Sequence, residues 1–103
     1  MTQDALAQVL FPEGFDERAR IEMSSKGWIS VMVLLENGLK YQVHFSDTTR
    51  LKQDMDENIQ SGKPFFAEPG LVVIPEVNTE LIYQVVHLLV KDGFFSSLQP
   101  SKE

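Results

Sequence analysis

The chain of 103 residues contains no cysteine and only two histidines, which leaves little material for metal or nucleophilic chemistry. Without cysteine there is no disulfide, no thiol nucleophile and no cysteine-based zinc site. The sequence also shows no histidine pairing at metal-ligand spacing, no glycine-rich phosphate loop and no GxSxG serine motif. We therefore predict no catalytic residue, no metal and no cofactor, and we lean against an enzyme.

Long apolar runs and clustered basic residues are missing as well. The longest apolar run, residues 29–35, is interrupted by Ser30 and is far shorter than the ~20 residues of a membrane-spanning helix. The N-terminal segment lacks the basic and apolar regions of a signal peptide. Nine scattered Lys and Arg residues in a chain of net charge −6 disfavour nucleic-acid binding. We expect a cytoplasmic protein with neither membrane nor nucleic acid as a partner.

The composition that remains is that of a globular protein. Hydrophobic residues make up 43% and charged residues 23% of the chain, and its length suits a single domain over residues 1–103. Within the first 15 residues we predict a short helix over 3–10, followed by a loop at Pro12 and Gly14. Residues 96–103 are predicted to be a frayed tail.

Three segments are predicted to be antiparallel strands that form a meander. Residues 19–23 alternate between apolar and polar, residues 27–35 are rich in β-branched side chains, and residues 39–46 form the return strand. Asn37-Gly38 between the last two predicts a two-residue hairpin loop, which sets their register. The face predicted to form the core then pairs Leu34 with Tyr41, Met32 with Val43, and Ser30 with Phe45.

The opposite face of this predicted hairpin would carry an apolar stripe beside polar groups from the neighbouring strand. Such a stripe needs a cover, and three fit: the N-terminal helix, a second copy of the chain, or a different protein. We predict an interaction surface made of these residues: Ile29, Val31, Val33, Leu35 and His44.

Two longer helices follow the hairpin. Asp47 is a suitable N-cap for a helix that ends at Gly62, and Asn78 for one that ends at Gly93. Between them, residues 71–74 read as a short buried strand. The first helix has a narrow apolar stripe, Leu51, Met55 and Ile59, and an acidic face formed by Asp54, Asp56 and Glu57.

The predicted fold is therefore α+β: the three-stranded meander, a crossover helix, a fourth strand and a C-terminal helix. Both long helices are expected to pack on one face of a four-stranded sheet, because right-handed crossovers place them on the same side. The sequence leaves the position of the fourth strand in the sheet open; if it joins the first strand of the meander, it runs parallel to it.

The two histidines are the side chains that could carry a ligand-binding or catalytic function. His87 falls on the polar face of the second long helix, near Tyr83, where a solvated histidine is the ordinary interpretation. His44 shares the half-polar sheet face with Gln42 and Ser46, and is the better candidate for a ligand-binding or catalytic group.

The leading hypothesis is a small acidic module without catalytic activity that acts by protein–protein contact as a homodimer. One alternative is a small-ligand binder or enzyme that uses His44 near the hairpin. The other is an acidic inhibitor or immunity-type protein whose Asp54, Asp56 and Glu57 contact a basic partner, with binding that weakens at high salt.

Overall fold

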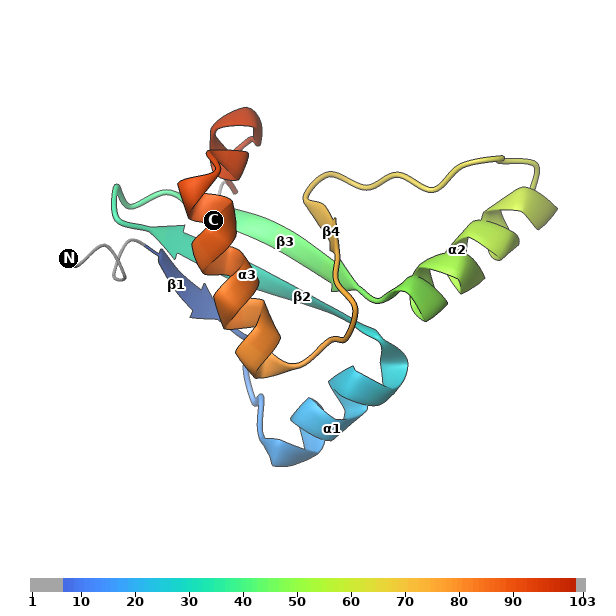
Figure 1. The fold of residues 1–103 in the computed structure, drawn as a ribbon, viewed down its shortest axis with the longest axis horizontal. Coiled ribbons are helices and arrows are strands. Elements are labelled where there is room, and N and C mark those ends of the chain that lie inside the picture. The colour runs from blue at the N-terminus through green and yellow to red at the C-terminus, as the bar shows by residue number, and fades with distance from the viewer. Residues whose placement is uncertain (1–6, 102–103) are drawn as a thin grey trace.

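The computed structural model describes residues 7–101, which form an α+β domain with a four-stranded mixed sheet (Figure 1). The order across the sheet follows the chain, with β1 antiparallel to β2, β2 antiparallel to β3, and β3 parallel to β4. The predicted fold class is confirmed. The elements are β1 (Ala7–Leu10), α1 (Glu17–Lys26), β2 (Trp28–Leu35), β3 (Lys40–Ser46), α2 (Thr48–Gln60), β4 (Leu71–Val73), α3 (Thr79–Lys91) and the 3-10 helix η2 (Phe94–Ser97).

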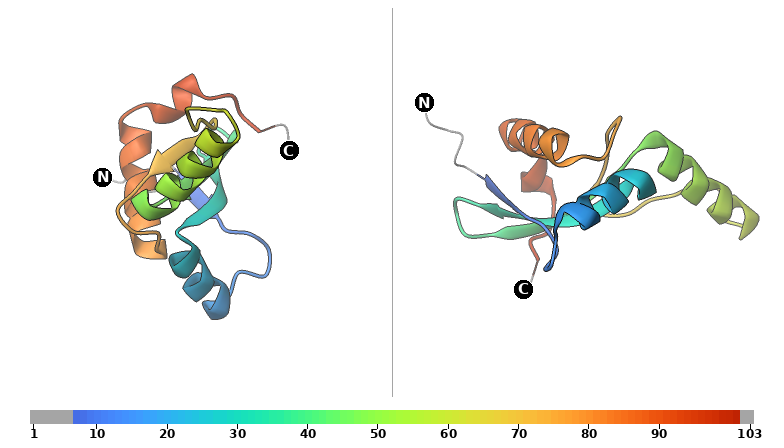
Figure 2. Two further views of the ribbon diagram at one scale, coloured as in Figure 1. Left: turned by 90° about the vertical axis from the view of Figure 1, so that its right-hand side faces the viewer. Right: turned by 90° about the horizontal axis from the view of Figure 1, so that it is seen from below.

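The core lies between one face of the sheet and α3 (Figure 2). Alternate residues of β2 and β3 supply its sheet side, and Ile82 and Val86 supply its helix side. Phe95 of η2 closes one end and packs on the ring of Tyr41, with ring centroids 5.2 Å apart. Asn78 caps α3 by accepting a hydrogen bond from the backbone of Leu81, as the sequence predicts.

The predicted register of the hairpin is wrong by one residue. Val31 lies opposite Val43, and Ser30, rather than Val31, lies opposite His44. The loop has three residues instead of two, because the Leu35 amide donates to the Leu39 carbonyl and Gly38 takes the left-handed conformation at φ 89°. A shift of one residue in register moves the side chains of β2 to the opposite face of the sheet from the one predicted. Ile29, Val31 and Val33 are therefore buried in the core.

The N-terminal segment is a strand where we predicted a helix. Residues 7–10 pair antiparallel with β2, and Val9 lies opposite Val33. The rest of the predicted helix, residues 3–6, lies outside the described residues. Pairing with an existing strand satisfies the backbone of four residues that are too few to form a stable helix alone.

Residues 19–23, predicted as a strand, belong to helix α1. Asp16 accepts a hydrogen bond from the Ala19 amide and caps the helix, which ends at Gly27 in the left-handed conformation. Only Met23 is buried, and Ile21 is 63% exposed. The apparent alternation of apolar residues therefore had no sheet face to occupy, and the local capping signals decided the structure.

Helix α2 differs from α3 in its placement. None of its residues is buried, and Figure 1 shows it extending beyond the end of the sheet. Its return segment runs back beside it, held by a hydrogen bond from the Asn58 side chain to the Phe65 carbonyl. Of the two long helices expected on one face of the sheet, α3 alone covers that face.

The fourth strand and the C-terminal tail both border β3. β4 pairs in parallel with the end of β3, with Val72 opposite Phe45, which fixes the position that the sequence left open. Beyond β4, the Ser101 amide donates to the Lys40 carbonyl at 2.7 Å. The described part of the predicted frayed tail is therefore held against the sheet.

Gly70 marks a close backbone approach that fixes the start of β4. It has φ 77°, and a Cβ atom there would lie 2.5 Å from the Gln42 carbonyl oxygen. Its own carbonyl accepts a hydrogen bond from the His44 amide at 2.9 Å. No L side chain fits this position without moving β3 and β4 apart.

We predict that Gly70→Ala lowers the free energy of unfolding by more than about 2 kcal/mol, since it adds a backbone clash to the ~1–2 kcal/mol cost of a left-handed alanine. Gly14→Ala is the matched control, because Gly14 also has a positive φ but has open space around it. Urea unfolding measures both variants. Equal losses in the two would show that the contact with Gln42 has no energetic importance.

Candidate functional site

The face of the sheet opposite α3 carries side chains that the chain leaves partly or fully exposed (Figure 2). We call it the open face. Register and alternation assign its members, about half of which are apolar. Besides Ser46, which is buried, they are Gln8, Leu10, Trp28, Ser30, Met32, Leu34, Lys40, Gln42, His44, Leu71 and Val73.

A serine–histidine pair lies near the middle of the open face. Ser30 of β2 and His44 of β3 are directly opposite each other, and Ser30 Oγ and His44 Nδ1 are hydrogen-bonded at 2.5 Å. Both side chains are partly buried. The bond orients the imidazole and leaves Nε2 available, which is the arrangement that a binding or proton-transferring histidine needs.

Three hollows adjoin this pair and form what we call the furrow. The middle hollow, about 270 Å³, lies between Trp28, Phe66 and the Ser30–His44 pair. A second, about 290 Å³, shares Trp28 and Ser30 with it and extends toward α1. A third, about 340 Å³, shares His44 and extends toward the C-terminal segment. Neighbouring hollows share wall residues, and together they extend from α1 past the Ser30–His44 pair to the C-terminal segment.

The N-terminal end of α2 forms one side of the furrow. The Arg50 guanidinium lies over the Trp28 ring, 5.7 Å from its centroid, and its Nε lies 3.2 Å from Asp54 Oδ1. Both Arg50 and Asp54 line the middle hollow. Trp28 is 41% exposed and serves this surface rather than completing the core.

The acidic face that the sequence predicts on α2 is largely neutralised within the helix. Asp54 pairs with Arg50, and the Lys52 ammonium lies 2.9 Å from Asp56 Oδ2. Each pair spans one helical turn, as expected for residues four apart. Glu57 is exposed and has no ion pair among the described residues.

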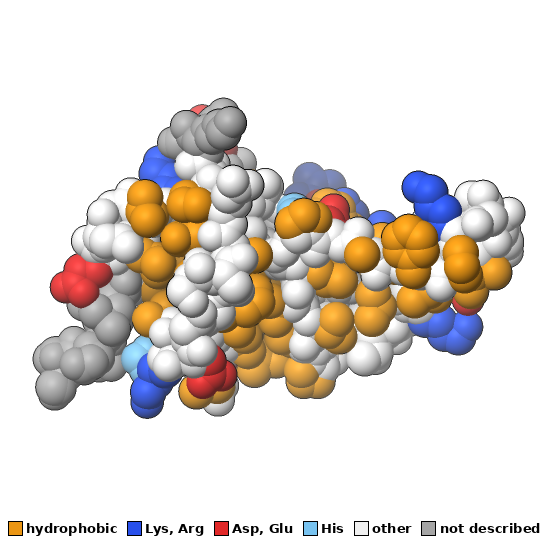
Figure 3. Space-filling model, turned by 90° about the horizontal axis from the view of Figure 1, so that it is seen from above, with side chains coloured by type: hydrophobic (Ala, Val, Ile, Leu, Met, Phe, Trp, Pro, Cys, Tyr) orange, Lys and Arg blue, Asp and Glu red, His pale blue; other side chains and the backbone are white. Residues whose placement is uncertain are grey.

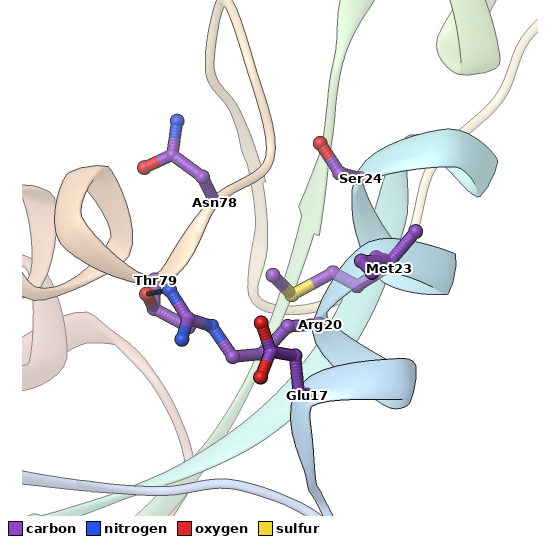
Figure 4. A pocket seen from close by; sticks show the side chains of 7 residues that line it. Glu17, Arg20, Met23, Ser24, Asn78 and Thr79 are labelled. Carbon is purple, nitrogen blue, oxygen red and sulfur yellow. Dashed lines mark hydrogen bonds between the residues drawn. The ribbon is translucent and has the colours of Figure 1, made fainter.

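A further hollow of about 240 Å³ lies between α1 and the start of α3 (Figure 4). Arg20 reaches across it and donates to Thr79 Oγ1 at 3.4 Å, while the Met23 side chain forms part of the wall. These contacts connect α1 to α3. The prediction of a strand over residues 19–23 leaves no place for this hollow, which depends on the helical position of Arg20 and Met23.

The predicted interaction residues fall on two different faces. Ile29, Val31 and Val33 are buried in the core, and Leu35 packs against it, so these side chains do not form the exposed stripe that the predicted register implied. His44 does lie on the open face. Sequence reasoning missed Trp28 and Ser30 as its neighbours, because their position depends on the register.

No protein family, curated protein or solved structure matches the chain, so its function rests on the geometry. None of the helices between residues 7 and 101 has the length and apolar character needed to cross a membrane. Over the same residues, no three His, Asp or Glu side chains gather as a metal site would require. His87, the other histidine, is partly buried on α3 beside exposed Tyr83.

We predict that Ser30→Ala lowers the free energy of unfolding by about 1 kcal/mol, because it removes the hydrogen-bond partner of a partly buried imidazole. It should also shift the ¹⁵N resonance of His44 Nδ1 in NMR spectra. Ser25→Ala is the control, since Ser25 is exposed on α1, and its effect should stay within about 0.5 kcal/mol. An unchanged Nδ1 resonance in Ser30→Ala would contradict the pairing.

Proposed function

We propose that this chain is a non-enzymatic protein-interaction module that works as a homodimer. We call α2 and its return segment, residues 48–66, the arm. The observation that carries the proposal is the exposure of apolar side chains along the arm, where Ile59 is 53% and Phe65 is 55% exposed. Figure 3 shows hydrophobic side chains along the arm and over the adjacent middle of the molecule.

The arm lacks the packing that normally stabilises a helix of this length. An isolated helix shorter than about 12–15 residues is marginal in water, and most helical stability in proteins comes from burying an apolar face. The Asp47 cap contributes only about 1 kcal/mol, and the part-buried Arg50–Asp54 pair and the exposed Lys52–Asp56 pair contribute a few tenths of a kcal/mol each. Burial of Leu51, Met55 and Ile59 against another chain would supply what is missing.

The dimensions of the chain agree with a part that projects from the domain. The radius of gyration is 14.4 Å, against about 13 Å for a compact domain of this length. The accessible surface is 6997 Å², against about 5,900 Å² for a compact monomer of 11.7 kDa. The excess of about 1,100 Å² is of the same order as the ~800 Å² that each partner buries in a stable interface.

The charges of the arm suit a second copy of the same chain. Residues 48–66 carry three basic and three acidic side chains, which sum to zero, whereas the whole chain has a net charge of −6. Two copies can therefore meet at their arms without the repulsion that their total charges would cause elsewhere. For the same reason the acidic-inhibitor alternative gains no support, because the arm offers a basic partner no net negative charge.

We predict that the wild-type chain sediments as a dimer, and that Ile59→Glu raises the dissociation constant at least tenfold. A tenfold rise in the dissociation constant corresponds to ~1.4 kcal/mol of binding free energy. Burying a carboxylate in an apolar interface costs more than this. Ile21→Glu is the matched control, because it makes the same substitution at an exposed helical isoleucine outside the arm. Sedimentation at several concentrations compares the three, and circular dichroism verifies that each is folded. A wild-type chain that remains monomeric throughout would refute the proposal.

A second candidate is a small-ligand binder or enzyme, favoured by the Ser30–His44 hydrogen bond at the floor of a hollow of about 270 Å³. A ligand there would contact Trp28 and Phe66, which suits a small molecule with an apolar part and a hydrogen-bonding group.

This candidate predicts that some members of a fragment library perturb the NMR signals of the Trp28 indole and the His44 imidazole together. His44→Ala should abolish the perturbation of Trp28, while His87→Ala, a histidine on α3, should leave it unchanged. If no fragment moves both signals, the ligand-binding candidate loses its support.

A further inference from the structure

The arm and the open face belong to one continuous surface. Arg50 and Asp54, at the base of the arm, line the same hollow as Trp28 and His44 of the sheet. Phe66, at the end of the arm, and Leu71 of β4 line it as well. The exposed apolar side chains of the arm therefore lie close to a furrow with a partly apolar lining, as a surface that pairs with its own copy requires.

The open face needs a cover of its own. Six apolar side chains on this face remain partly or fully exposed: Leu10, Trp28, Met32, Leu34, Leu71 and Val73. A sheet with apolar side chains on both faces is normally covered on both. α3 covers the other face, and Figure 2 shows α2 continuing past the end of the sheet rather than folding under it.

The arm of the same chain is held away from the open face by Asp47. This single residue connects β3 to α2, and its side chain caps the helix by accepting a hydrogen bond from the Arg50 amide at 2.8 Å. Its own amide donates to the Gly27 carbonyl at 2.9 Å, and its carboxylate occupies the space where a Cβ of Gly27 would lie. Folding the arm onto its own sheet would break both hydrogen bonds.

We propose that each copy places its arm in the furrow on the open face of the other, so that two copies exchange arms reciprocally. This inference rests on the proposed homodimer and specifies its geometry. The exposed Ile59 and Phe65 are the side chains of the arm that are available as anchors, and aromatic and large aliphatic residues are the usual anchors of interfaces. In the furrow they meet Trp28 and Leu71, which line the middle hollow together with the Ser30–His44 pair. Met32 lies next to Ser30 on the same face of β2.

Mixing two variants, each blocked in one half of the contact, tests the exchange. Ile59→Glu blocks the arm, and Met32→Glu blocks the open face. Reciprocal exchange predicts that each variant alone is monomeric, and that an equimolar mixture forms a mixed dimer with one intact arm–furrow contact. That dimer should be weaker than the wild type by roughly a hundredfold or more. The readout is sedimentation of one fluorescently labelled variant with and without the other.

Gln42→Glu serves as a second open-face variant should Met32→Glu fail to fold. Gln42 is exposed on the same face and the change is nearly isosteric, so the fold should tolerate it. Ile21→Glu, mixed with Ile59→Glu, is the control for non-specific association.

The outcomes distinguish the arm exchange from the formation of a homodimer as such. If both open-face variants remain fully dimeric while Ile59→Glu is monomeric, the arms contact each other, and the exchange is refuted while the homodimer stands. If both types of variant are monomeric but their mixture forms no dimer, reciprocal exchange is also refuted. A wild-type monomer at every concentration would refute the proposed function and the exchange together.

Discussion

The register between β2 and β3 is the constraint on which the rest of the structure depends. It places Ile29, Val31 and Val33 directly beside Phe45, Val43 and Tyr41, so that the sheet has one fully apolar face for α3 to cover. The same register places Ser30 beside His44 on the opposite face. A slip of one residue would leave the β-branched residues of β2 exposed and separate the serine from the histidine.

The end of β3 connects this core to the surface on which the proposed function rests. Ser46 is buried at the last position of β3, and α2 begins only two residues later. Asp47 therefore has to complete the strand and cap the helix at once, and its hydrogen bonds to Gly27 and Arg50 set the direction of the arm. A local capping interaction thus sets the direction in which α2 and its narrow apolar stripe project from the domain, which favours contact with another chain.

Elements that depend on local signals could be predicted from the sequence. α2 and α3 lie where Asp47 and Asn78 were expected to cap them, and β2 and β3 lie where the β-branched residues indicated strands. α1 carries equally clear signals in Asp16 and Gly27, whereas the alternation of residues 19–23 predicts a strand. In a segment that buries only one residue, the caps are the more informative signal.

The candidate site could be predicted only in part. His44 was identified on the half-polar face, but its partner Ser30 and the neighbouring Trp28 follow from a register that Asn37-Gly38 alone did not determine. The three-residue loop was selected because it aligns the apolar residues of both strands on one face, and the gain from burying them exceeds the preference of a dipeptide for one turn type.

The sequence by itself determined the class of the fold, the limits of its long helices and the absence of cysteine chemistry, because these depend on composition and on residues close together in the chain. Only the tertiary structure decided which face of β2 is buried, where β4 pairs, and that α2 remains uncovered. Those outcomes depend on contacts between segments distant in sequence, where each side chain is placed by the burial of all the others.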